Sequence, residues 1–161
     1  MDEWVPVIKN TNKSIVRIVL YCEGEIVSEG TGTIISATGI VLTAWHVVET
    51  CNYYVNEKKD YSLFVFTAKG RFLYKLCSTQ FFIGMPLIED EKLELEIDLA
   101  LLEPLQPVIF DNYLVPVISQ INVEMGSDLL ICGYSEETPN FMDFQSIGAK
   151  MFKGQLNEEF K

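Results

Sequence analysis

Residues 30–48 read GTGTIISATGIVLTAWHVV, and their pattern of glycines and β-branched residues is the strongest structural signal in the chain. The stretch holds two short apolar runs, residues 31–36 and 40–43, on either side of a turn that contains Gly39. Two short strands joined by a glycine turn predict a β-hairpin. The second run leads into the only histidine of the chain, His46. Histidine is the side chain that most often serves as a general base, so His46 is a candidate for that role.

Outside this stretch, the first hundred residues are rich in β-branched and aromatic side chains, which favour strands. Further strands are predicted at residues 14–22, 52–56, 63–67, 71–77, 81–84 and 97–102, and a single helical turn at residues 45–49. Six or seven short strands of this kind predict a small antiparallel β-barrel. Four aromatic residues recur at period two and are predicted to face the barrel interior: Phe64, Phe66, Phe72 and Tyr74.

The second part of the chain begins after three prolines, Pro104, Pro107 and Pro116, which predict an extended connector over residues 104–117. The predicted organisation is therefore a first barrel at residues 1–103 and a second unit at residues 118–161. Strands are expected there at residues 127–133 and 145–153. Because three or four strands leave open edges, we expect a second barrel that is only begun.

Composition limits the classes of function. The 161 residues carry 23 acidic and 12 basic side chains, a formal net charge of -11. This excess of acid argues against nucleic-acid binding and against an anionic membrane surface. The first residues have no basic, apolar leader pattern, and no window is apolar enough to span a membrane, so a cytoplasmic location is expected.

The four cysteines show no C-x-x-C spacing, which argues against a zinc site. Without an export signal, they are expected to be reduced thiols buried in strands: Cys22, Cys51, Cys77 and Cys132. The sequence predicts no metal ion and no cofactor, because its many carboxylates have no partner histidines.

The sequence around His46 resembles the trypsin-like peptidases, and most closely their bacterial HtrA-like branch. The resemblance rests on the glycine-flanked strand, the short hairpin and the Thr43-Ala44-Trp45-His46-Val47-Val48 turn; it is tight over residues 30–48 and loose over residues 14–133. It implies an all-β, chymotrypsin-like double β-barrel whose first barrel is complete here. It also implies that His46 acts as general base and then general acid.

The resemblance also implies a Ser-His-Asp catalytic triad, and Asp98 is its predicted acid. It opens Asp98-Leu99-Ala100-Leu101-Leu102, which resembles a strand that the family places after its aspartate. Such a carboxylate accepts a hydrogen bond from the imidazole Nδ1–H and stabilises the imidazolium, and we expect it to be held firmly and partly dehydrated. Glu94 and Glu96 are nearby alternatives. Asp98 is preferred because the four residues after it form the only uninterrupted apolar strand of this region.

A nucleophilic serine is not found. About ninety residues separate the acid and the serine in the protease template, and this count from Asp98 passes Lys161. Ser135 follows Gly133-Tyr134 but lacks a second glycine, and Ser127 and Ser146 lack flanking glycines. Cys132 is interpreted as a packed thiol, because nothing electropositive surrounds it in the sequence.

Two functions from different classes follow from these observations. The first is the N-terminal portion of a trypsin-like serine endopeptidase that acts on polypeptide substrates, with the serine outside this chain or on a partner segment. The alternative is a catalytically inactive, protease-like binding module that pairs a partner strand with its exposed strand edges.

Overall fold

The computed structural model describes residues 4–57, 59–77, 98–116, 128–134 and 150–155. The helices are α1 (Trp4–Asn12), α2 (Trp45–Val48) and α3 (Thr50–Asn56). The strands are β1 (Ile15–Cys22), β2 (Glu25–Ile34), β3 (Val41–Thr43), β4 (Tyr61–Thr67), β5 (Gly70–Leu76), β6 (Ala100–Pro104), β7 (Asp128–Gly133) and β8 (Lys150–Gln155).

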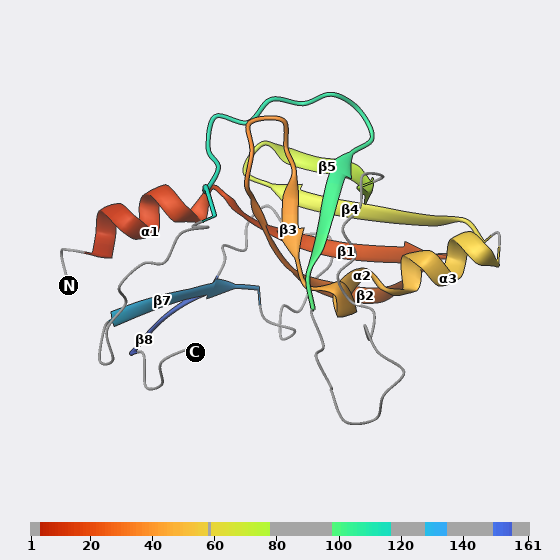
Figure 1. The fold of residues 1–161 in the computed structure, drawn as a ribbon, viewed down its shortest axis with the longest axis horizontal. Coiled ribbons are helices and arrows are strands. Elements are labelled where there is room, and N and C mark those ends of the chain that lie inside the picture. Colours follow the sequence, from red (N-terminus) through yellow and green to blue (C-terminus); the bar gives the residue numbers. More distant parts are fainter. Residues whose placement is uncertain (1–3, 58, 78–97, 117–127, 135–149, 156–161) are drawn as a thin grey trace, which may run out of the picture.

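Six of these strands close into an antiparallel barrel in the order β1-β2-β3-β6-β5-β4, as Figure 1 shows. β1 lies between β2 and β4, so Ile18 is paired with Gly30 on one side and with Val65 on the other. The small antiparallel barrel predicted from the sequence is confirmed. Closure also removes the free edges that an open sheet of these strands would leave.

The barrel core follows from the alternation of side chains along each strand. Residues two apart point to the same face, and the inward set is almost wholly aliphatic. Its fully buried members include Val16, Ile18, Leu20, Ile34, Val41, Leu63, Val65 and Leu102. Residues 105–116 arch over one end of the barrel, where the buried ring of Phe110 closes the core (Figure 1).

Gly32 allows the barrel to close tightly at the start of the histidine-bearing hairpin. A Cβ at this position would lie 2.5 Å from Val41 Cγ1 and 2.9 Å from Ile18 Cδ1. Both distances are shorter than real Cβ contacts, so only glycine fits while β1 and β3 keep their present separation. The glycine-flanked pattern of the sequence therefore reflects close packing of the barrel wall.

Two secondary-structure predictions are wrong. Residues 52–56, predicted as a strand, belong to the helix α3. The aromatic and β-branched residues there favour a strand locally, but α3 follows α2 after one residue, Glu49, and buries Cys51 in the core. The N-terminal helix α1 was not predicted at all.

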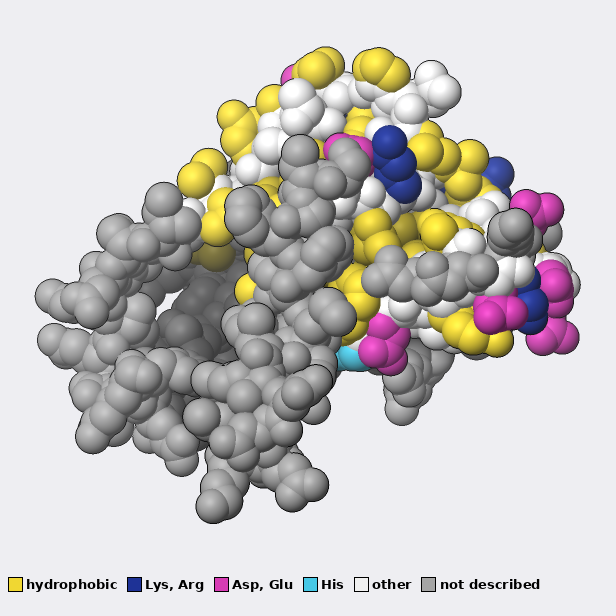
Figure 2. Space-filling view, turned by 45° about the vertical axis from the view of Figure 1, so that its right-hand side comes forward, with side chains coloured by type: hydrophobic (Ala, Val, Ile, Leu, Met, Phe, Trp, Pro, Cys, Tyr) yellow, Lys and Arg dark blue, Asp and Glu magenta, His cyan; other side chains and the backbone are white. Residues whose placement is uncertain are grey.

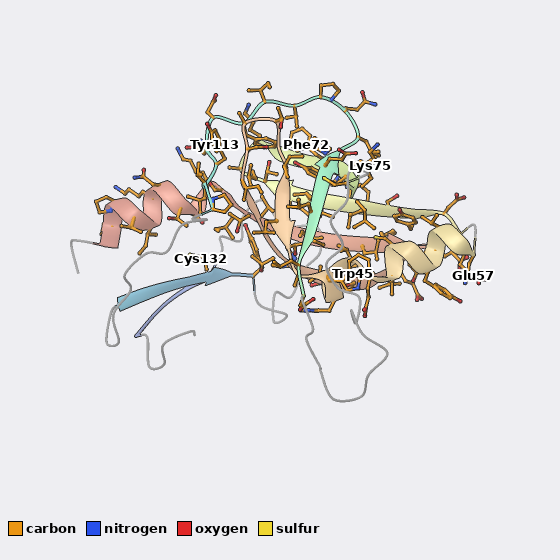
Figure 3. The ribbon with its side chains drawn as sticks, in the orientation of Figure 1. Trp45, Glu57, Phe72, Lys75, Tyr113 and Cys132 are labelled. Carbon is orange, nitrogen blue, oxygen red and sulfur yellow. The ribbon has the colours of Figure 1, made fainter. Side chains whose placement is uncertain are left out.

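The prediction of which β4 side chains face the barrel interior is also wrong. Leu63 and Val65 face the interior, while Phe64 and Phe66 lie on the outer face and are partly exposed. On β5 the prediction holds, since Tyr74 is buried and Phe72 packs against the core (Figure 3). Both phases place apolar residues at the central positions of β4, so alternation alone does not distinguish them.

β7 and β8 form a two-stranded antiparallel sheet outside the barrel, and β7 contacts β1 and β2 (Figure 1). The strand predicted at residues 81–84 lies outside the described residues, as do the first residues of the strand predicted at 145–153.

All four cysteines are free thiols. Cys22 is buried in β1 as predicted, whereas Cys51 is buried on a helix rather than a strand. Cys132, on β7, is labelled in Figure 3. It and Cys77, just beyond β5, are only partly buried, so the prediction of buried thiols is wrong for these two.

Candidate active site

His46 is the second residue of the single helical turn α2, three residues beyond the end of the short strand β3 and two beyond the extended residue Ala44. The strand end is fixed by Thr43, whose Oγ1 donates to the carbonyl of Thr31 on β2 at 2.8 Å. Trp45, on the same turn, is partly buried and packs against the core. The backbone that carries the imidazole is therefore held by the Thr43 hydrogen bond and by the packing of Trp45.

Val47, the residue after His46, is pressed against β2. The Ser28 Oγ donates to the Val47 carbonyl at 2.7 Å, and the Val47 side chain is only 4% exposed. Gly30 permits this approach, because a Cβ there would lie 2.5 Å from Val47 Cγ2. In the sequence, the signal for this contact is the alternation of Ser28, Gly30 and Gly32 along one face of β2; the motif around His46 alone does not predict it.

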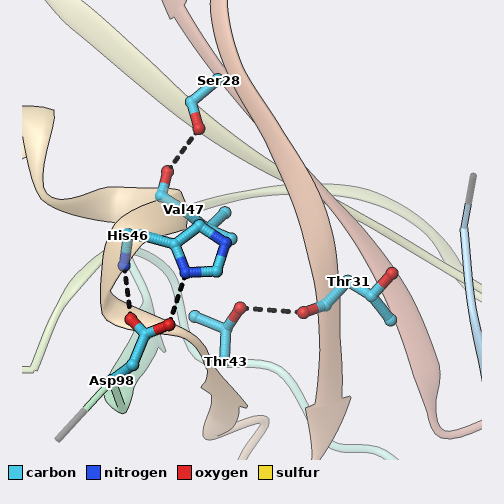
Figure 4. Close-up of polar contacts among 6 residues, drawn as sticks. All are labelled: Ser28, Thr31, Thr43, His46, Val47 and Asp98. Carbon is cyan, nitrogen blue, oxygen red and sulfur yellow. Dashed lines mark hydrogen bonds and ion pairs between the residues drawn. The ribbon is translucent and has the colours of Figure 1, made fainter. Parts of the chain in front are cut away.

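Asp98 lies two residues before β6, next to the histidine turn. β6 pairs with β3 so that Ala100 is opposite Thr43, which brings residues 98 and 46 together across the sheet. One carboxylate oxygen accepts the backbone N–H of His46 at 2.8 Å, and the other is 2.5 Å from Nδ1 of its ring (Figure 4). The structure thus brings together the two predicted site residues.

These contacts lower the pKa of the Asp98 carboxyl below its ordinary value. The first cause is the hydrogen bond from the His46 backbone N–H, and the second is the bond from its side chain. Asp98 is therefore ionised and can only accept hydrogen bonds. It follows that Nδ1 carries the ring proton, which leaves Nε2 of the neutral ring as an acceptor that points away from Asp98 (Figure 4).

The pair is accessible. The side chain of His46 is 69% exposed and that of Asp98 is 46% exposed, and the only histidine is visible at the surface beside an acidic side chain in Figure 2. Asp98 is held firmly as expected, but it is less dehydrated than the sequence analysis predicted. An accessible Nε2 is what a general base needs in order to reach a substrate or a nucleophile.

The other residues considered as site members are not part of this arrangement. Glu94, Glu96 and the three serines considered as nucleophiles lie outside the described residues. Burial raises the pKa of the Cys132 thiol, which does not favour a thiolate nucleophile. Across the ranges that the structure describes, no three His, Cys, Asp or Glu side chains gather as metal ligands. None of the helices in those ranges has the length and apolar character needed to cross a bilayer.

Comparison with known proteins gives a match at the level of the fold. No family model and no curated protein matches the sequence. Among solved structures, the Rv3671c protease in its inactive form aligns with a TM-score of 0.60 and 19% sequence identity. The alignment covers 96% of this chain and 57% of the protease chain, so this chain spans a little over half the length of that structure.

At this identity the similarity establishes the fold alone. The chain has a mostly-β fold with a closed six-stranded antiparallel barrel of the chymotrypsin-like kind, similar to the barrel of a protease. The predicted fold class is confirmed for this first barrel.

Proposed function

We propose that this chain is the portion of a trypsin-like serine endopeptidase that carries the general base, His46, and its orienting acid, Asp98. The observation that carries the proposal is the double contact of one carboxylate with residue 46, at 2.8 Å to the backbone nitrogen and 2.5 Å to Nδ1. A protease-like barrel and the HtrA-like sequence pattern around His46 support it further.

In this mechanism each side chain has one task. His46 takes the proton of a serine hydroxyl through Nε2 as the serine oxygen attacks the peptide carbonyl carbon. Asp98 stabilises the imidazolium that forms, and His46 then gives the proton to the departing amine. A water molecule then attacks the carbonyl carbon of the serine ester, and His46 takes a proton from that water. As the ester bond breaks, His46 returns the proton to the serine oxygen, which releases the carboxylate product and completes hydrolysis of the peptide bond.

The nucleophilic serine is proposed to come from polypeptide that these 161 residues do not include. The sequence contains no Gly-x-Ser-Gly-Gly segment, and no serine in it has the glycines that the family places around its nucleophile. The 161-residue chain by itself is therefore expected not to hydrolyse unfolded casein. Cleavage of casein by the purified chain, blocked by a sulfonyl fluoride, would contradict this assignment of the serine.

The proposal is tested by labelling with a fluorophosphonate probe. The chain is supplied with the polypeptide encoded next to it, as one longer protein or as a second fragment, and labelling of a serine is followed over time. We expect labelling that His46→Ala abolishes and that Asp98→Asn slows by about 10⁴-fold. Glu49→Gln, an exposed change close to the same turn, is the control and retains wild-type labelling. Equal labelling of the wild type and His46→Ala would overturn the proposal.

A second candidate function is a protease-like binding module without catalysis. It is favoured by the β7–β8 sheet, in which each strand pairs only with the other as far as the structure describes the chain. The outer edges of such strands offer backbone groups to an extended partner peptide. If His46→Ala removes partner binding while no protease activity is found in the wild type, this second function is supported over the first.

A further inference from the structure

Thr31 joins two parts of the molecule that are far apart in the sequence. Its Oγ1 accepts the backbone N–H of Tyr134, just beyond β7, at 2.8 Å. Its carbonyl accepts a hydrogen bond from the Thr43 hydroxyl, in the segment that leads into His46, also at 2.8 Å. One residue of β2 is thus bonded both to the β7–β8 unit and to the histidine segment, and Thr31 and Thr43 are drawn together in Figure 4.

The surface around Thr31 is packed as an interface. Arg17 of β1 is paired with Thr31 across the ladder, is only 3% exposed, and forms an ion pair with Glu29 at 2.5 Å. β7 contacts β1 and β2 at this place. A Cβ on Gly133 would lie 3.3 Å from Thr31 Oγ1, so β7 approaches Thr31 closely. Burial raises the pKa of the Tyr134 phenol, in agreement with a packed contact.

We propose that Thr31 is the positioning residue that docks the end of β7 against the barrel beside the His46 segment. Thr31 faces outward, while its neighbours Gly30 and Gly32 pack against Val47 and Val41 on the opposite face of β2. The Gly-Thr-Gly segment therefore holds the histidine turn on one side and the second unit on the other. The catalytic consequence of this docking rests on the proposed function.

That consequence follows from the geometry of proton transfer. A general base must lie within hydrogen-bond reach of the proton that it takes. A displacement of about 1 Å, even one caused by a change far from the reacting atoms, can slow a reaction about 100-fold. If the second unit leads to the serine, the Thr31–Tyr134 contact helps to set how that serine meets Nε2.

The direct test is amide hydrogen exchange at Tyr134, measured by NMR on the whole chain. Thr31→Val keeps the β-branched shape and the backbone carbonyl but removes the accepting Oγ1. We expect the Tyr134 amide to exchange about tenfold faster, as expected for loss of one hydrogen bond that closes a local contact. Thr31→Ser, which keeps a hydroxyl, restores protection close to that of the wild type.

Thr33→Val is the matched control, because Thr33 lies two residues along the same face of β2. It is expected to leave the Tyr134 amide unchanged. The titration of the Asp98 carboxyl is expected to be the same in Thr31→Val as in the wild type, since neither His46 nor Asp98 bonds to the Thr31 side chain. An unchanged Tyr134 exchange rate in Thr31→Val would overturn the docking role.

Fluorophosphonate labelling adds the catalytic readout. With the serine supplied, Thr31→Val is expected to be labelled at least about tenfold more slowly, with the Asp98 titration unaltered. Faster Tyr134 exchange with unchanged labelling would contradict the effect on the serine. No labelling in the wild type contradicts the proposed function, whereas the docking role is still decided by the Tyr134 amide.

Discussion

At the scale of single residues, the site depends on one carboxylate that holds both the backbone and the ring of His46. The backbone contact fixes where the turn begins, and the ring contact fixes which nitrogen carries the proton. Both are possible because β3 and β6 are neighbours in the barrel, although they are distant in the sequence. The strand pairing of the barrel thus produces the local chemistry.

The first prediction concerns the titration of Asp98. His46→Ala removes the ring donor but leaves the backbone N–H, which is the larger cause of the lowered pKa. We therefore expect the Asp98 pKa to rise toward its ordinary value without reaching it, as measured by ¹³C NMR of the carboxyl carbon. Because this pKa is lower in the folded state, the contact stabilises the fold above the ordinary pKa of aspartate, and the stabilisation is lost as the pH falls through the folded value. An identical titration in His46→Ala would contradict the contact.

The second prediction tests the contact of β2 with Val47. Gly30→Ala places a Cβ 2.5 Å from Val47 Cγ2 and 2.7 Å from its Cγ1. We expect the free energy of unfolding in urea to fall by about 1–3 kcal/mol, because overpacked positions destabilise by this amount. Val47→Ala removes both clashing atoms, so the double variant should lose less than the sum of the single losses. Strict additivity would show that the two residues do not compete for space.

The sequence predicts the contacts around His46 only in part. His46 and Asp98 were identified because their flanking residues resemble a known pattern, and the structure brings them together. Ser28 and Thr31 were not identified, because their roles depend on which residues lie opposite them in space. Such contacts are set by strand pairing, which a single sequence does not specify.

At the scale of elements, the predictions failed where tertiary packing decides between two locally acceptable structures. Residues 52–56 favour a strand by composition, yet they belong to the helix α3, in which Cys51 is buried in the core. On β4 either phase offers apolar residues to the interior, and the aliphatic Leu63 and Val65 occupy it. The barrel itself was predictable because the number and spacing of short strands do not depend on such choices.

The third prediction concerns the hairpin between β2 and β3. Gly39 has a φ of +86°, and a Cβ there would lie 2.9 Å from Phe110 Cε2 and 3.0 Å from the Tyr74 hydroxyl. We expect Gly39→Ala to reduce the free energy of unfolding by more than the ~1 kcal/mol of backbone strain alone. Gly24→Ala is the matched control, since Gly24 has the same φ but open space around it. Thermal unfolding that gives equal losses for the two variants would contradict the packing at Gly39.

At the scale of the whole molecule, the thiols report how stability is distributed. Cys51 is fully buried, and burial raises its pKa to about 12, while Cys77 and Cys132 are partly exposed. We expect a thiol reagent at pH 8 to modify Cys77 and Cys132 in the folded protein and Cys51 only after unfolding of the barrel. Peptide mapping by mass spectrometry identifies the modified sites. Modification of Cys51 at the same rate as Cys77 would contradict a closed barrel.

The closed barrel carries the histidine turn, and Thr31 of its β2 strand bonds both to Thr43, which precedes that turn, and to Tyr134 beyond β7. The physical basis of the proposed catalysis is the state of the His46 imidazole, since a base must have its lone pair on Nε2. The barrel achieves this through a single carboxylate that the β3–β6 pairing brings to Nδ1.

The most direct measurement is therefore ¹⁵N NMR of the His46 ring in the neutral state, for which the single histidine of the chain gives one unambiguous set of signals. The account predicts a proton on Nδ1, shifted strongly downfield by Asp98, and an unprotonated Nε2. Asp98→Asn should remove the downfield shift and allow the other tautomer. A ring that carries its proton on Nε2 in the wild type, or a spectrum unchanged by Asp98→Asn, would contradict the role assigned to His46.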